Sequence, residues 1–148
     1  MIPPTPTTKV DPALVRGVLG EMLPAGSGKP EMVRLHVPGT NYELHLVPGG
    51  PLPGPAGSKV VGRIEAAARR IDLVGAGGRY IEPVAGNPRR VQGMVIGVDE
   101  VGGRVIVNAG ATVHLKPTDA RQRAGQFEPG TMVSCDVLDG ATFTPATV

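Results

Sequence analysis

Cysteine and aromatic residues are nearly missing from this chain. Cys135 is the one cysteine among 148 residues, and aromatic side chains make up 3%. A single cysteine excludes a disulfide within the chain and a zinc site built from several thiolates. Because aromatic rings are so few, the core has to be built from Val, Ile, Leu, Met and Ala. A binder of single-stranded nucleic acid would also lack most of the usual stacking platforms.

Long apolar runs are missing as well. No segment approaches the roughly 18 consecutive apolar residues that a membrane-spanning helix needs. The first residues, MIPPTPTTKVDP, do not combine a basic region with a following apolar stretch, so they do not resemble a signal peptide. We therefore expect no membrane contact and a cytoplasmic location.

Catalytic and metal-binding patterns are also missing. The segment GSGK at 26–29 resembles a phosphate-binding loop, but Leu23 and Pro30 stand where that motif needs Gly and Ser or Thr. The three histidines, His36, His45 and His114, are expected on exposed strand faces without the close spacing of metal ligands. Cys135 shares the parity of its apolar neighbours and is expected to be buried. The sequence predicts no enzyme activity, no metal and no cofactor.

Glycine and proline are plentiful, with 22 and 16 residues, and they separate Val-rich segments as turns do. The segment 48–58, PGGPLPGPAGS, reads as a linker. We therefore predict an N-terminal unit at 1–47, a Pro/Gly-rich linker at 48–58, and a β-barrel domain at 59–148.

The N-terminal unit is expected to hold a short helix and a β-hairpin. In 11–23, apolar residues recur at spacings of three and four behind Asp11 as a cap and Pro12 at the first helical position. In 31–47, apolar and polar residues alternate on both sides of Gly39-Thr40, which predicts a hairpin with His36 opposite Glu43.

The remaining segments indicate an all-β fold. Short strands are expected at 59–66, 69–74, 79–84, 89–100, 102–110 and 111–117. A short helix is expected at 118–127, followed by a turn, a strand and a hairpin within 128–143. This order resembles a small OB-like barrel on the C-terminal side of the chain.

Arginines supply the main functional signal. The candidate nucleic-acid-binding residues are Arg63, Arg69, Arg70, Arg79, Tyr80, Arg89 and Arg90. Neighbouring strands could gather these guanidinium groups for phosphate oxygens. The competing interpretation is an ordinary solvated sheet face balanced by acidic residues, because the chain has 15 Lys/Arg against 13 Asp/Glu.

Two functions therefore stay open. The first is a non-catalytic β-barrel module that binds RNA or single-stranded DNA through an arginine-lined face. The alternative is a homo-oligomeric scaffold or protein-interaction domain without nucleic-acid binding, since small barrels often complete their cores by association.

The stretch RYIEPVAGNPRRVQG at 79–93 combines most of the candidate residues. We predict that it forms two antiparallel strands joined by the turn around Asn87 and Pro88. Strands of about five or six residues would place Arg79 and Tyr80 roughly 15 to 20 Å from Arg89 and Arg90.

Overall fold

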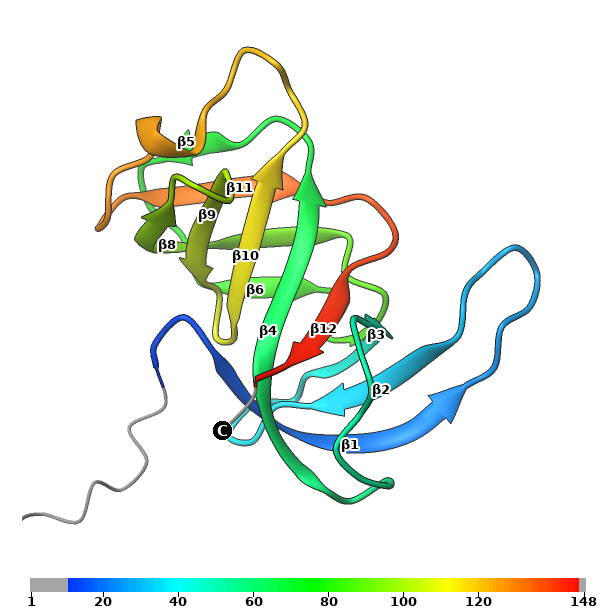
Figure 1. Cartoon of the computed structure of the whole chain (residues 1–148). Helices are drawn as coiled ribbons and strands as arrows, with labels where there is room; N and C mark the ends of the chain where they lie inside the picture. Colours follow the sequence, from blue (N-terminus) through cyan, green and yellow to red (C-terminus); the bar gives the residue numbers. More distant parts are fainter. Residues whose placement is uncertain (1–10, 147–148) are drawn as a thin grey trace, which may run out of the picture.

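The computed structural model describes residues 11–146, which form a nearly all-β structure without an α-helix (Figure 1). Its strands are β1 (Val15–Leu23), β2 (Met32–His36), β3 (Glu43–Pro48), β4 (Lys59–Ala68), β5 (Asp72–Val74), β6 (Tyr80–Glu82), β7 (Ala85–Gly86), β8 (Arg90–Asp99), β9 (Arg104–Asn108), β10 (Thr112–Pro117), β11 (Met132–Asp136) and β12 (Thr142–Pro145). One 3-10 turn, η1 (Ala124–Gln126), lies between β10 and β11.

Five strands close into a first ring. They run in the order β1–β2–β3–β12–β4, and an antiparallel pairing of β4 with β1 returns to the start. The contact between β3 and β12 is parallel, whereas the other pairings in the ring are antiparallel. A closed β-barrel is thus confirmed, but it was expected within 59–148, and three strands of this ring, β1, β2 and β3, come from residues before 59.

A second ring shares β4 with the first. Beyond Ile64, β4 pairs in parallel with β10, and the order continues through β9 and β8 to β11. The ring closes through an antiparallel bridge between Ala68 and Val137, flanked by hydrogen bonds from Arg69 N–H and Leu138 N–H. In Figure 1, β4 runs up the height of the molecule through both rings.

Three short strands are attached to this frame. The strand β6 pairs with the beginning of β8, β7 pairs with β3, and β5 pairs with β11 at the end of the sheet order. The β6–β8 pairing confirms the antiparallel neighbours predicted within 79–93.

One hydrophobic core runs through both rings. Leu35, Leu44 and Phe143 are fully buried in the first ring, and Val95 and Val107 are fully buried in the second. Each such side chain contributes roughly 1.5 to 3 kcal/mol by leaving water. Gly62 in β4 makes room for this packing, because a Cβ there would lie 2.5 Å from Phe143 Cζ and 2.5 Å from the Thr144 carbonyl oxygen.

The helix predicted at 11–23 is wrong, because Val15–Leu23 forms strand β1. The apolar residues of this segment also fit an alternating pattern, with Val15, Gly17 and Leu19 buried and their neighbours more exposed. Gly17 and Gly20 disfavour a helix, and pairing with both β2 and β4 satisfies the backbone. Tertiary pairing therefore overrides the three-and-four spacing.

The helix predicted at 118–127 is reduced to the turn η1. The hairpin prediction is confirmed, with His36 opposite Glu43 and Arg34 opposite His45. The domain boundary at 48–58 stays a prediction. In the structure, strands before and after this segment belong to one ring, and Leu52 packs against the shared core.

Candidate nucleic-acid interface

The arginine face is the outer surface of β6, β8 and β11. Register places Tyr80 beside Gln92 and Ser134, and it places Glu82 beside Arg90 and Asp136. Side chains that lie opposite one another in neighbouring strands point to the same face of a sheet. The structure therefore brings Tyr80 and Arg90, two of the candidate residues, onto one surface.

Arg90 is held by the residues around it. Its Nη1 donates to Asp136 Oδ1 at 2.7 Å, and its Nη2 donates to Ser134 Oγ at 2.8 Å. A hydrogen bond to Tyr80, followed by that to Asp136, raises the pKa of the guanidinium further above its usual range. Arg90 thus links three strands of the sheet and is not a free phosphate ligand.

Tyr80 is also engaged. Its hydroxyl donates to Gln92 Oε1 at 3.1 Å, and Gln92 Nε2 donates to the Gly78 carbonyl at 2.9 Å. Gln92 is buried, so its amide fixes the turn that leads into β6. The ring of Tyr80 is half-buried and unsuited to extensive stacking with a base.

The predicted separation of 15 to 20 Å between the two arginine groups is wrong for Tyr80 and Arg90, which contact each other. The reason is length, because β6 has three residues and Glu82 already lies opposite Arg90.

The other candidate residues are spread around the molecule. Arg79 is exposed and its Nη2 lies 3.9 Å from Met94 Sδ. Arg70 pairs with Asp72 at 3.2 Å, and Arg69 lies at the end of β4, where its N–H donates to the Asp136 carbonyl. Arg63 lies on a different face, paired with Glu65 on the outside of β4.

Acidic side chains neutralise the arginine face. Glu82, Arg90 and Asp136 lie in one row across the sheet, with Arg69 next to Asp136. Arg90 is paired with Asp136, and Arg70 is paired with Asp72 on the neighbouring strand β5. Guanidinium groups that carboxylates already hold are less available to phosphate oxygens than unpaired ones.

Arg89 faces a different environment, the Lys29–Arg89 hollow. This hollow has a volume of about 570 Å³ and is lined by Lys29, His45, Glu82, Pro83, Gly86, Asn87, Arg89 and Asp139. His45 projects from β3, Lys29 comes from the loop between β1 and β2, and the other residues come from the segment between β4 and β12. No ion pair occupies the Arg89 or Lys29 side chain within residues 11–146.

Burial lowers the pKa of His45, and the positive charges of Arg34 and Lys29 lower it further. Its imidazole is therefore neutral at pH 7, when one ring nitrogen donates and the other accepts a hydrogen bond. With Asn87 beside it, the hollow offers donors and acceptors for a base edge together with two cations for phosphate oxygens. Sequence reasoning found Arg89 but missed Lys29 and His45, since only the fold joins these segments.

The histidine and cysteine predictions have different outcomes. His114 was expected to be exposed and is 4% exposed, because the chain before β1 crosses it and its Nε2 donates to the Ala13 carbonyl at 2.7 Å. Cys135 is buried as expected, and burial raises the pKa of its thiol to about 12.

Membrane and metal features can be stated for the described range alone. Between residues 11 and 146, no helix is long and apolar enough to cross a membrane. The same residues contain no group of three or more His, Cys, Asp or Glu side chains placed to hold a metal ion.

No family model, no curated protein and no solved structure matches this chain.

Proposed function

We propose that the chain is a non-catalytic binding module with an OB-like architecture, and that a single strand of RNA or DNA binds in the Lys29–Arg89 hollow. The observation that carries the proposal is the position of this hollow on the first ring. It also moves the expected site away from the arginine face.

In OB-like barrels, oligonucleotides bind the face of the second and third strands, between the loop joining strands one and two and the loop joining strands four and five. The corresponding strands of the first ring are β2 and β3. Lys29 belongs to the loop between β1 and β2, and Arg89 belongs to the long connection between β4 and β12. If the first ring is used as an OB-like barrel is, the hollow lies beside the third strand and between the two loops that such barrels use, which supports the proposal.

The charges in the hollow favour weak, shallow binding. Lys29 and Arg89 face Glu82 and Asp139, so the formal charge of the lining is 2 − 2 = 0 with His45 neutral. Affinity would come from hydrogen bonds of His45 and Asn87 to base edges as much as from phosphate contacts. The lining contains no aromatic ring, so stacking of bases on the protein would add little to the affinity.

The non-catalytic part of the proposal is supported by the state of the one cysteine. A thiol with a pKa of about 12 is protonated at neutral pH, and the thiolate is the reactive form. Cys135 is therefore a core residue and not a nucleophile.

The test uses fluorescein-labelled dT10 and U10 with the full chain, and it measures fluorescence anisotropy across a salt series. The double variant Lys29→Ala/Arg89→Ala should weaken binding at least tenfold. It should also reduce the slope of log K against log salt by about 1.4, because each lost contact to a single strand removes about 0.7.

A matched control removes the same charge elsewhere. The variant Arg121→Ala/Arg123→Ala changes two cations in the segment that follows β10 and should leave the affinity for dT10 within about twofold. Equal weakening by both variants would mean that attraction is diffuse, and no binding of either oligonucleotide at low salt would remove nucleic acid as the ligand.

A protein-interaction role is the second candidate, and one specific feature favours it. Among residues 11–146, the strand β5 ends the sheet order with one edge unpaired, at the opposite end of the molecule from β2 and β3 (Figure 1).

A further inference from the structure

The outer edge of β5 is open for pairing. Its partner β11 takes Asp72 opposite Ser134 and Val74 opposite Met132. On its other side, β11 forms hydrogen bonds to β8 through its odd-numbered residues. The bond from the Val137 N–H to the Arg89 carbonyl continues this pattern just beyond β11. Backbone groups alternate sides along a strand, so Asp72 and Val74 point their N–H and C=O toward β11. Ile71, Leu73 and Gly75 therefore point theirs away from the sheet.

The side chain of Gln122 already imitates a neighbouring strand at Ile71. The Ile71 N–H donates to Gln122 Oε1 at 2.8 Å, and Gln122 Nε2 donates to the Ile71 carbonyl at 2.7 Å. These two bonds are the pair that a peptide group of an added strand would make. They show that the Ile71 N–H and C=O point away from β11, on the side where a further strand would pair.

Gln122 replaces a neighbouring strand at Ile71 but not at Leu73. Leu73 is 67% exposed, and within the described part of the chain no other segment pairs with β5 on this side. Edge strands are usually protected by a Pro, an inward charge, a bulge or a covering loop. At Leu73 the edge has none of these, and a large apolar side chain stands beside its outward N–H and C=O.

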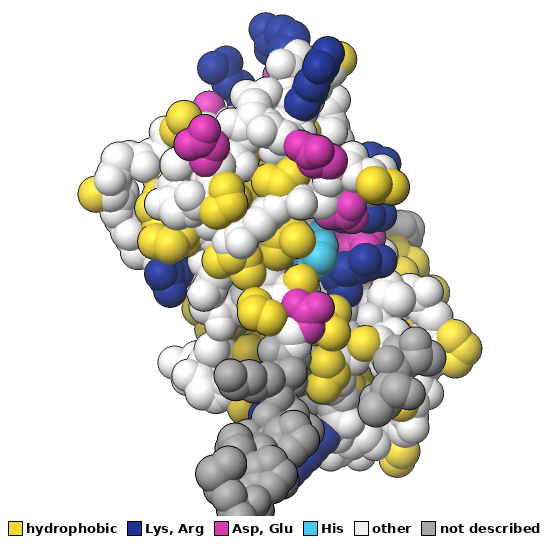
Figure 2. All heavy atoms as spheres, turned by 60° about the vertical axis from the view of Figure 1, so that its left-hand side comes forward, with side chains coloured by type: hydrophobic (Ala, Val, Ile, Leu, Met, Phe, Trp, Pro, Cys, Tyr) yellow, Lys and Arg dark blue, Asp and Glu magenta, His cyan; other side chains and the backbone are white. Residues whose placement is uncertain are grey.

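The charge near this edge is positive on balance. Two hollows meet at Gln122 and Gln126, and Gln122 is the residue that bonds Ile71. Their charged lining residues together with Asp72 of β5 are Arg70, Lys116, Arg121 and Arg123 against Asp72, Glu100 and Asp119, which gives 4 − 3 = +1. Figure 2 shows Lys and Arg side chains gathered at the same upper end of the molecule where Figure 1 places β5.

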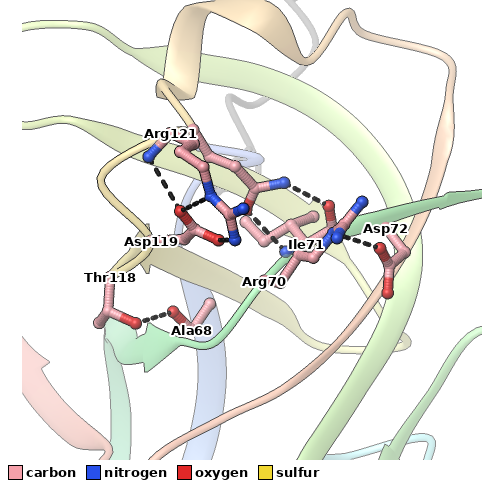
Figure 3. A network of polar contacts seen from close by, with 8 residues as sticks. Ala68, Arg70, Ile71, Asp72, Thr118, Asp119 and Arg121 are labelled. Atoms are coloured by element: carbon pink, nitrogen blue, oxygen red, sulfur yellow. Dashed lines mark hydrogen bonds and ion pairs between the residues drawn. The ribbon is translucent and has the colours of Figure 1, made fainter.

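The arginines are arranged close to the edge itself. Arg70 and Arg121 lie on either side of Ile71, and each also contacts a carboxylate, Asp72 or Asp119 (Figure 3). The Asp119 carboxyl has a pKa of about 2, chiefly because Arg121 donates hydrogen bonds to it. Exposed ion pairs of this kind are worth little, so an incoming carboxylate can share these guanidinium groups.

We infer that the open edge of β5 docks an extended, acidic peptide segment of a partner protein. The segment adds a strand beside β5 that begins where Gln122 ends. Its backbone pairs with Leu73 and Gly75, one apolar side chain covers Leu73, and its carboxylates lie near Arg121 and Arg123. Such main-chain pairing with alternating side-chain contacts is a known mode of peptide recognition. A nucleic acid has no backbone N–H and C=O to continue the ladder, so this site is separate from the Lys29–Arg89 hollow.

The probe is a labelled ten-residue peptide of alternating Glu and Val, compared with the same peptide carrying Lys in place of Glu. Binding is followed by anisotropy, and amide hydrogen exchange is measured by NMR on the full chain. The acidic peptide should bind at least tenfold more tightly than the basic one. In its presence the Leu73 and Gly75 amides should exchange at least tenfold more slowly, while both exchange freely in the unbound protein.

The decisive variant is Leu73→Pro. Proline removes an N–H that the fold does not use, and edge strands tolerate it where that N–H faces solvent. Binding of the acidic peptide should fall at least tenfold, whereas Leu73→Ala, which keeps the N–H, should retain most of it. Arg121→Ala/Arg123→Ala should weaken the acidic peptide and leave dT10 binding unchanged. Lys29→Ala/Arg89→Ala should weaken dT10 binding and leave the affinity for the acidic peptide unchanged.

Several outcomes would overturn the inference. They are equal binding of the two peptides, unchanged binding by a folded Leu73→Pro variant, or unaltered exchange at Leu73 and Gly75 in the peptide complex. The exchange measurement uses the unmodified chain, so it decides the matter even if Leu73→Pro fails to fold. A dimer that Leu73→Pro dissociates would identify a second copy as the occupant, and protection of Leu73 by dT10 would identify nucleic acid.

Discussion

The two rings share β4, but they are closed differently. In the first ring, β1 and β4 pair over four residues, whereas in the second a single bridge between Ala68 and Val137 completes the circle. The first ring buries Leu and Phe side chains, and the second buries mostly Val. The added strands β5 and β6 lie on the second ring. The more loosely closed ring is therefore the one that offers an unpaired edge.

The rings also resemble each other in a way that sequence does not reveal. Each contains a long strand, β1 or β8, whose register shifts along its length, between Leu19 and Met22 or between Val95 and Gly97. Such bulges bend a strand and let it pair with different neighbours at its two ends. Each ring also contains one parallel contact, β3 with β12 or β10 with β4.

The largest effect is expected in β4, the strand that the two rings share. Gly62→Val should destabilise the protein by about 3 kcal/mol or more, because the new side chain meets Phe143 and a backbone oxygen in a packed core. Chemical denaturation should show one transition at lower denaturant, since β4 belongs to both rings. Gly50→Val is the control, with no atom within 4 Å of its Cβ position. Similar losses from both variants would contradict the shared-strand interpretation.

A smaller effect is expected at the contact between the rings. Tyr42 comes from the β2–β3 connection, and its hydroxyl donates to the Ala109 carbonyl at 2.8 Å and accepts from the Ile81 N–H at 2.9 Å. Tyr42→Phe leaves both buried groups without a partner and should cost about 1 to 3 kcal/mol in thermal or chemical denaturation. Tyr80→Phe removes a hydroxyl from a half-buried ring and should cost less. The reverse order would show that the rings do not depend on this bridge.

The smallest effect is a pH dependence that arises in the second ring. Burial lowers the pKa of His114 below its ordinary 6.5, and the positive charges of Arg63 and Arg104 lower it further. The hydrogen bond to the Ala13 carbonyl and the negative charge of Glu65 oppose this shift. The unfolded chain then binds the proton first, so the stability is complete above pH 6.5 and declines as the pH falls from 6.5 toward the lowered value.

The measurement compares unfolding free energies at pH 7.5 and 5.5. The wild type should lose stability by up to about 1.4 kcal/mol for each unit of pKa difference. His114→Gln should lose less, and the remaining decline should come partly from His45, whose pKa is also lowered. An identical pH dependence in the variant would exclude His114 as the source.

Local pattern was enough to predict the all-β class, most strand positions and the β2–β3 register. In that hairpin, alternation and the turn at Gly39 act on the same few residues. The pattern failed at β1, where Val and Leu fit a helix face and a strand face equally well and pairing with β4 decides. It also failed at His114, because the residue that covers it, Ala13, is far away in the sequence.

The candidate site was predictable only in part for the same reason. Arginine clustering along the sequence found Arg89 and Arg90, two neighbours in the chain that the fold places in different surroundings. Arg90 donates hydrogen bonds to Asp136 and Ser134, whereas Arg89 lines the hollow together with Lys29 and His45. Which side carries the function depends on segments that lie about 45 to 60 residues away in the chain, and no local pattern contains that information.

The place of β12 has a consequence for how the chain reaches its native state. Thr142 and Phe143 fill the gap between β3 and β4 by pairing with Val47 and Pro48 on one side and with Glu65 and Ile64 on the other. During synthesis from the N-terminus, the first ring therefore cannot close until all strands of the second ring have been made. Until then the edges of β3 and β4 that β12 covers stay unpaired. Contacts of such high sequence separation slow folding. The order of translation and the order of ring closure thus run in opposite directions, and the nascent chain is most exposed to aggregation just before its last strand arrives.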